Sequence, residues 1–276
     1  MMYLEQLKSS ALFNLSLSSK ELFHSNLIAW LLEKTPLKDY LGNYFIKAAG
    51  QELSGWSELK VKREMKGLDL VLCYECDDIV SILVIENKVK SVPYPSQLER
   101  YDRTISKSSW NIKGKVLLTL SKPPFLTGYS QGELEYGDWK VITYEDFLEV
   151  LRNGLNVIKR EPYLHHLVND YIYFLDCLVE LDKAIVLRES EPFDAFNNPL
   201  LAELKELRLH DFYLKKQYQQ LAKLIHDRIS NKLNVNIQSL GTEIEWNSTG
   251  NKLYVNYGMT RATGMVDIKF LISKLI

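Results

Sequence analysis

The sequence predicts a mixed α/β fold in which a core of helices and strands is followed by a C-terminal module of helix and small β-sheet. Three observations predict this class. Apolar residues recur at helical spacing over residues 18–32, and the segments 67–72 and 82–88 are short stretches rich in Leu, Val and Ile. Near the C-terminus, the alternating segments 242–246 and 253–257 are typical of a β-hairpin.

The predicted core runs in the order helix, three-strand antiparallel meander, helix and fourth strand. Its first helix covers residues 18–32, where apolar residues follow Ser18 at helical spacing. The later elements are, in order, strands over 59–64, 67–72 and 82–88, a helix introduced by Pro93 and Pro95, a strand over 115–120, and helices over 144–153 and 163–181. The last of these helices is expected to cover the sheet.

The second and third strands place two acids opposite each other. If the turn between them centres on Asp77 and Asp78, residues whose numbers sum to 155 are paired, so Asp69 faces Glu86. Directly opposed side chains have Cβ atoms about 4.5–5.5 Å apart, and like charges at that distance repel. Lys88 lies two residues beyond Glu86, so these two side chains point to the same face of the sheet.

A positive charge is needed between these acids. Two carboxylates that converge among apolar strands raise each other's pKa unless a cation compensates, and a hard divalent cation prefers oxygen ligands. The alternative is a structural ion pair of Asp69 and Glu86 with Lys88, but one lysine cannot neutralise two carboxylates. We therefore expect a metal site with Asp69 and Glu86 as ligands and Lys88 beside the nucleophile.

These residue types suit metal-assisted hydrolysis of a phosphodiester. A Mg²⁺ ion, for which Mn²⁺ can substitute, lowers the pKa of a bound water and polarises a phosphoryl oxygen. Lys88 is expected to orient that water or to offset charge that develops on the phosphoryl oxygens. The chain has no Gly-x-x-x-x-Gly-Lys phosphate loop, which argues against a nucleotide-driven enzyme such as a helicase.

Asp69 and the triplet Glu86-Asn87-Lys88 resemble the motif of the PD-(D/E)XK nuclease superfamily, although Leu68 stands where the motif has proline. The resemblance extends from residue 18 to about residue 151 and implies a restriction-endonuclease-like core. The Glu-x-x-His-Ser pattern at residues 21–25, which leads into an apolar helix, is similar to a bacterial subgroup of unassigned role.

The resemblance also implies roles for residues on two helices. The superfamily often carries an acid on the first helix, and Glu21 is the candidate metal ligand; the alternative is a capping box formed by Ser18 and Glu21. Gln97 and Tyr101 resemble the Gln-x-x-x-Tyr motif of the exonuclease-like branch, so we expect Gln97 to act at the site. Nucleic-acid contacts are expected from Gln97, Arg100, Tyr101 and Arg103. The alternative for these four is an ordinary helix with buried rings and solvated charges.

Composition is that of an ordinary globular protein. The net charge is −1 over 276 residues, which argues against coating of nucleic acid by bulk electrostatics. A modest excess of basic residues between Lys60 and Lys115 is enough to hold a few phosphates. Cys73 and Cys76 are spaced as in some zinc and redox sites, but with Cys177 as the one further cysteine we expect them to be small residues in and after a strand.

Neither a secretory signal nor an apolar run of about 18 residues is visible in the sequence, so we expect a cytoplasmic protein with no membrane contact. A break between Pro192 and Pro199 separates a predicted nuclease-like domain over 1–190 from an accessory module over 191–276. The module is expected to hold a long helix to about Leu233, then strands over 242–246, 253–257 and 265–271. Homodimer formation, partner binding and clamping of nucleic acid are all open as its role.

Together these features predict a Mg²⁺-dependent nuclease that cuts phosphodiester bonds, with DNA as the expected substrate. The alternative is a catalytically silent nucleic-acid-binding or assembly protein that retains the nuclease fold. The intact set of Asp69, Glu86 and Lys88 favours the enzyme, whereas the near-neutral charge and the unexplained C-terminal module keep the alternative open.

Overall fold

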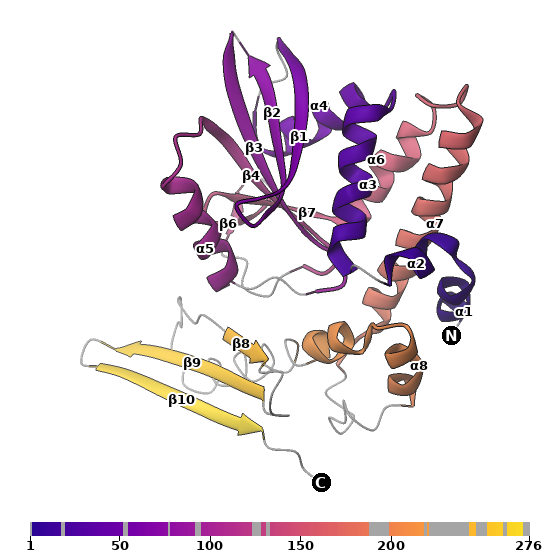
Figure 1. The fold of residues 1–276 in the computed structure, drawn as a ribbon. Coiled ribbons are helices and arrows are strands. Elements are labelled where there is room, and N and C mark those ends of the chain that lie inside the picture. The colour runs from indigo at the N-terminus through magenta and orange to yellow at the C-terminus, as the bar shows by residue number, and fades with distance from the viewer. Residues whose placement is uncertain are drawn as a thin grey trace. The chain divides into compact units, whose positions relative to one another are not determined.

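The computed structural model describes residues 2–17, 20–51, 55–76, 78–91, 95–122, 128–130, 133–187, 199–217, 220, 243–246, 253–261 and 264–272. These residues form two compact units (Figure 1). The larger unit contains the described residues up to 91, then 99–122 and 128–184, and the smaller unit contains the rest. The boundary expected after residue 190 stays a prediction.

A seven-stranded sheet is the centre of the larger unit. In sheet order its strands are β1 (Trp56–Met65), β2 (Leu68–Cys76), β3 (Ile79–Lys88), β4 (Ile112–Thr119), β7 (Trp139–Thr143), β6 (Glu133–Tyr136) and β5 (Gly128–Ser130). The first three strands form the predicted antiparallel meander, and β4 lies parallel to β3. The strand β7 was not predicted; it pairs parallel to β4 and extends the sheet beyond the predicted fourth strand.

Two tight turns set the register of the meander. Lys66 and Gly67 both have positive φ angles, 56° and 80°, and Met65 pairs with Leu68, as in a two-residue turn whose twist matches the strands. Between β2 and β3, Cys76 pairs with Ile79. From Leu70 and Ile85 to Cys76 and Ile79, the residue numbers of each pair in this hairpin sum to 155, so the predicted register is confirmed.

Helices cover both faces of the sheet, which explains why β3 is buried at every position from Ser81 to Lys88. On one side, α3 (Lys20–Lys34) packs on β1, β2 and β3 and against α4 (Lys38–Ala48), and α6 (Tyr144–Gly154) packs on β7 and against α7 (Pro162–Ala184) (Figure 1). Two short helices, α1 (Met2–Ser9) and α2 (Ala11–Ser16), contact α7. The other face is contacted by Tyr101 of α5 (Pro95–Ser106). In the described part of the chain, no helix is both long and apolar enough to cross a membrane.

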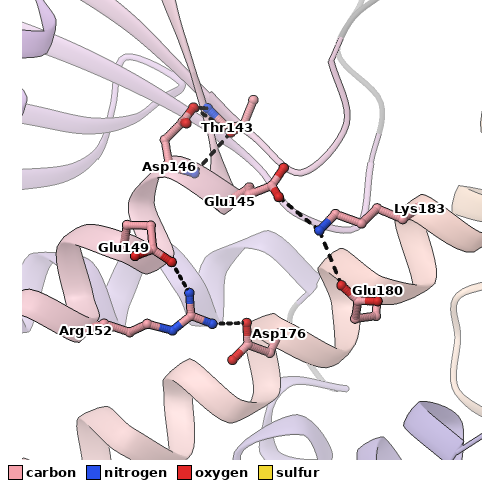
Figure 2. A network of polar contacts seen from close by, with 8 residues as sticks. All are labelled: Thr143, Glu145, Asp146, Glu149, Arg152, Asp176, Glu180 and Lys183. Carbon is pink, nitrogen blue, oxygen red and sulfur yellow. Dashed lines mark hydrogen bonds and ion pairs between the residues drawn. The ribbon is translucent and has the colours of Figure 1, made fainter.

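Ion pairs join α6 to α7 beside the sheet. Lys183 of α7 lies 2.9 Å from Glu145 of α6 and 3.3 Å from Glu180 of its own helix, and Arg152 of α6 pairs with Asp176 of α7 (Figure 2). These side chains are partly exposed, so each pair contributes at most about 1 kcal/mol. Their main effect is to fix the relative orientation of two helices that both supply tyrosines to the interior.

The smaller unit contains α8 (Leu200–Glu206), a second helical segment over residues 210–217, and a three-stranded antiparallel sheet of β8 (Glu243–Trp246), β9 (Leu253–Arg261) and β10 (Gly264–Ile272). The predicted strands are therefore confirmed, except that Thr242 lies outside the described residues. The prediction of one long helix is wrong. Arg208 has a φ of 53°, and Leu209 N donates to Leu204 O, so the helix ends in a left-handed cap before the next one begins. Residues 221–233 of the predicted helix lie outside the described residues.

Candidate active site

Two carboxylates meet where β2 begins and β3 ends. Leu70 and Ile85 are the last paired residues of β2 and β3 at this end, and one further step along both strands sets Asp69 opposite Glu86, as predicted. The backbone N–H of Asn87 donates to Asp69 Oδ2 at 2.8 Å, and the charge of Asp69 acts on Glu86. The two acids therefore converge on one point at the edge of the buried sheet.

Burial is the largest influence on the charge of these acids. Glu86 is fully buried and Asp69 is half-buried. Burial raises the pKa of Glu86 to about 7, an effect that Lys88 opposes and the Asp69 charge reinforces. Burial also raises the pKa of Asp69, against the opposing influence of Lys88 and the Asn87 N–H. The site therefore holds a proton near neutral pH that a bound cation would displace.

Lys88 is the cation that this part of the fold supplies. Its Nζ lies 2.5 Å from Glu86 Oε1, and the residue is 8% exposed. Burial alone would lower the pKa of Lys88, but the charges of Glu86 and Asp69 outweigh burial and raise it. Lys88 therefore stays protonated over the whole range in which the protein would work.

Tyr101 approaches Glu86 from α5. Its ring is buried, and its hydroxyl donates to Glu86 Oε1 at 3.0 Å. The helix is held in place by the next residue, Asp102, which accepts hydrogen bonds from Lys115 Nζ at 2.8 Å and Trp139 Nε1 at 3.0 Å. In the structure, Tyr101 therefore orients the Glu86 carboxylate. Its expected contact with nucleic acid stays a prediction.

The other residues expected to act from α5 lie along the same helix. Gln97 precedes Tyr101 by four residues and so shares its face of the helix. Arg100 and Arg103 are exposed. Contacts of these three residues with metal or nucleic acid stay predictions.

The Glu21 side chain reaches from α3 to the end of β3, where it accepts hydrogen bonds from backbone N–H groups. Its Oε2 accepts from Val89 N at 2.6 Å and its Oε1 accepts from Lys90 N at 2.9 Å. Burial raises the pKa of Glu21, while these N–H groups and Lys88 lower it. Glu21 therefore fixes the chain that follows Lys88, and its expected role as a metal ligand stays a prediction. The alternative partner in a capping box, Ser18, lies outside the described residues.

Asn87, the middle residue of the Glu-x-Lys triplet, points to the opposite face of the sheet. It is fully buried, its Nδ2 donates to Ser25 Oγ at 3.1 Å, and its Oδ1 accepts from Tyr144 Oη at 2.7 Å. Its side chain is thus held by α3 and α6, while its backbone N–H holds Asp69. The two faces of β3 are coupled through this one residue.

His24 is a further buried polar group beside this network. Its Nδ1 lies 3.0 Å from Tyr171 Oη, and its ring centroid lies 6.2 Å from that of Tyr144. Burial lowers the pKa of His24, which keeps the ring neutral, so one of its two nitrogens carries a proton.

A family model described as the PD-(D/E)XK nuclease superfamily matches residues 11–173, more than half of the chain. The chain belongs to the PD-(D/E)XK nuclease superfamily. The predicted resemblance and the restriction-endonuclease-like fold are therefore confirmed. No curated protein and no solved structure matches the chain. The matched region contains all three residues of the predicted motif, Asp69, Glu86 and Lys88.

PD-(D/E)XK nucleases typically use divalent metals, and the donors of this site fit such an ion. Among the described residues, no group of three or more His, Cys, Asp or Glu side chains is placed to bind a metal. Two converging carboxylates nevertheless match Mg²⁺, which keeps several waters and is commonly held by one or two carboxylates. Their raised pKa values also show that the pocket favours added positive charge.

Sequence reasoning missed the residues that support this site from a distance. The sequence analysis did not assign roles to Asn87, Asp102, Tyr144 and Tyr171, and His24 was not expected to act. The one signal for Asn87 was its place between Glu86 and Lys88, because alternation in a strand turns it to the other face. Its partners come from helices far along the chain, and no local pattern marks them.

Proposed function

We propose that this chain is a metal-dependent nuclease that hydrolyses phosphodiester bonds in DNA, with Mg²⁺ as the metal and Mn²⁺ able to replace it. The observation that carries the proposal is the strand register that sets Asp69 opposite Glu86, with the Lys88 ammonium 2.5 Å from Glu86. Membership of the superfamily supports nuclease chemistry. DNA as the substrate rests on the sequence-based expectation.

Charge balance supports this reaction at this site. Two carboxylates and one ammonium leave a net charge of −1, and a divalent cation held by Asp69 and Glu86 makes it +1. That charge offsets the single negative charge of a phosphodiester, so the buried site is neutral when substrate is bound. When bound there, Mg²⁺ supplies an activated water and polarises a phosphoryl oxygen.

The residues of the chain then have distinct tasks. Lys88, which remains protonated, offsets charge on the phosphoryl oxygens as the transition state forms. Tyr101 and the backbone N–H of Asn87 hold the two carboxylates in the convergent orientation. Because these groups are positioned by helices and a central strand, little rearrangement is needed at the moment of reaction.

Cleavage of linear DNA, circular DNA and RNA by purified protein, with Mg²⁺ or Mn²⁺, tests the proposal. Wild type is compared with Glu86→Gln and Lys88→Met, which keep side-chain size but remove the charge. Loss of cleavage in both variants supports the assigned site. Equal cleavage by all three proteins excludes it, and absence of cleavage and of metal binding favours the silent binding protein instead.

The test also separates modes of action. Degradation of linear but not circular DNA indicates an exonuclease, and cutting of circles indicates an endonuclease. A cytoplasmic location and a homodimer through the C-terminal module stay part of the proposal. Fractionation of cells and sedimentation of the purified protein measure these two properties.

A further inference from the structure

A basic hollow lies on the larger unit. It has a volume of about 510 Å³ and is lined by Lys66, Arg100, Arg103, Thr104 and Lys107. Four of these side chains are cationic and the fifth is a hydroxyl, and none of the five is acidic. We call this set the basic hollow.

The cations of the basic hollow come from two elements. Arg100, Arg103, Thr104 and Lys107 follow one another at helical positions i, i+3, i+4 and i+7, and therefore form one stripe along α5 and its C-terminal end. Lys66 comes from the turn between β1 and β2, where its φ of 56° is set by the hairpin.

Contacts with uncharged groups place these side chains without neutralising them. Lys66 Nζ lies 4.7 Å from the centre of the Trp110 ring, and the Arg100 guanidinium lies 5.5 Å from the centre of the Tyr101 ring. Arg103 Nε donates to Glu99 O at 3.4 Å, and Thr104 Oγ1 donates to Arg100 O at 3.0 Å. Within the described part of the chain, no ion pair links Lys66, Arg100, Arg103 or Lys107 to a carboxylate. Four unneutralised cations around one hollow repel each other and create a positive potential that attracts an anion.

The length of the hollow exceeds a single phosphate. From Arg100 to Lys107 the rise of an α-helix amounts to about 10 Å. A stripe of this length is longer than one phosphate group, so it can contact more than one phosphate of a strand. A polyanion with regularly spaced charges fits better than an isolated small anion.

The basic hollow is next to the catalytic residues in the chain. Tyr101, whose hydroxyl donates to Glu86, lies on α5 between Arg100 and Arg103. Lys66 precedes Asp69 by three residues at the same end of the sheet. The helix that carries most of the cations therefore also carries Tyr101, and the turn that carries Lys66 leads directly into the strand of Asp69.

We propose that the basic hollow binds the sugar-phosphate backbone of the polynucleotide that is cut, on the strand segment adjoining the scissile phosphate. This inference rests on the proposed nuclease function and adds the residues that hold the substrate, Lys66 and Lys107 among them. Contacts to phosphate carry no sequence information, so the hollow sets position and affinity and leaves sequence preference to other residues.

Binding without cleavage tests the inference separately from the nuclease activity. Fluorescence anisotropy of a labelled 20-nucleotide strand and of the matching duplex is measured in EDTA, from 50 to 300 mM NaCl. The test variant is Arg103→Gln with Lys107→Gln. The matched control is Lys159→Gln with Arg160→Gln, which removes the same charge from two exposed residues between α6 and α7. Circular dichroism melting verifies that both variants are folded.

The expected result is a change in salt dependence. Loss of two phosphate contacts reduces the slope of log K against log salt by about 1.8 for duplex and about 1.4 for single strand. At 0.1 M salt this corresponds to about 60-fold and about 25-fold weaker binding, respectively. Lys66→Gln alone should give about half the change in slope.

Test and control variants with the same slope and the same affinity would overturn the inference. Weaker binding by the test variant alone supports it even if the protein cleaves no substrate, in which case the proposed nuclease function fails and the hollow stands as a nucleic-acid site. Cleavage at wild-type rates and wild-type salt dependence in the test variant would leave the nuclease function standing and overturn the role of the hollow.

Discussion

In the absence of metal, the free energy of unfolding of Glu86→Gln should increase relative to that of wild type as pH rises. The fold buries this carboxyl completely and raises its pKa to about 7, compared with 4.5 for an ordinary glutamate. The folded state therefore binds the proton more tightly than the unfolded state does. This contribution to stability is fully present below pH 4.5 and is lost as pH rises through 7.

The size of the effect follows from the two pKa values. A tenfold difference in proton affinity corresponds to about 1.4 kcal/mol. Between pH 5 and pH 8, the wild-type free energy of unfolding should fall by roughly 2–3 kcal/mol on account of Glu86. Glutamine does not titrate, so the stability of Glu86→Gln relative to wild type should improve by that amount over the same interval. A constant cost of the substitution cancels in this comparison.

Urea unfolding followed by circular dichroism, at pH 5 and pH 8 in EDTA, measures this difference. Addition of Mg²⁺ at pH 8 should then stabilise wild type, by about 2.7 kcal/mol at a hundred times the dissociation constant, and should stabilise Glu86→Gln far less. A variant whose stability differs from wild type by the same amount at both pH values would refute the claim that burial holds a proton on Glu86.

Three further predictions concern the neighbours of Glu86. Lys88→Met should lower kcat by about 100-fold or more, because it removes a transition-state contact; a shift confined to KM in steady-state kinetics would contradict this role. Tyr101→Phe removes a hydrogen bond to ionised Glu86 and should move the acidic limb of the kcat/KM profile upward by about one pH unit, whereas an unchanged profile would count against it. Tyr144→Phe leaves the buried Asn87 Oδ1 without a donor and should lower the free energy of unfolding by about 1–3 kcal/mol. Urea unfolding measures this difference, and a variant as stable as wild type would show that the contact is unimportant.

The meander and its register could be predicted because they depend on local signals. The polar turn at residues 75–78 separates two apolar stretches of matching length, and this symmetry sets Asp69 against Glu86. The strand β7 could not be recognised in the same way. Its five residues, Trp139–Thr143, lack an alternating pattern, and they form a strand because β4 offers a parallel partner from elsewhere in the chain.

The supports of the site escape sequence reasoning for a related reason. Tyr144 lies 57 residues from Asn87, and Tyr171 lies 147 residues from His24, so their hydrogen bonds exist only after the helices have packed on the sheet. The end of α8 is a different case. Arg208 adopts a left-handed backbone conformation, which glycine usually adopts at the end of a helix. Because the residue here is arginine, the sequence does not indicate that the helix ends.

The most direct measurement is the position of a metal ion in crystals grown with Mn²⁺, whose anomalous scattering identifies it. The account predicts a peak at about the 2.0–2.2 Å distances of metal–oxygen bonds from a carboxylate oxygen of Asp69 and one of Glu86, with the Lys88 ammonium nearby. Bound Mn²⁺ at some other site, with no peak beside Asp69 and Glu86, would contradict the assignment of these two residues as metal ligands.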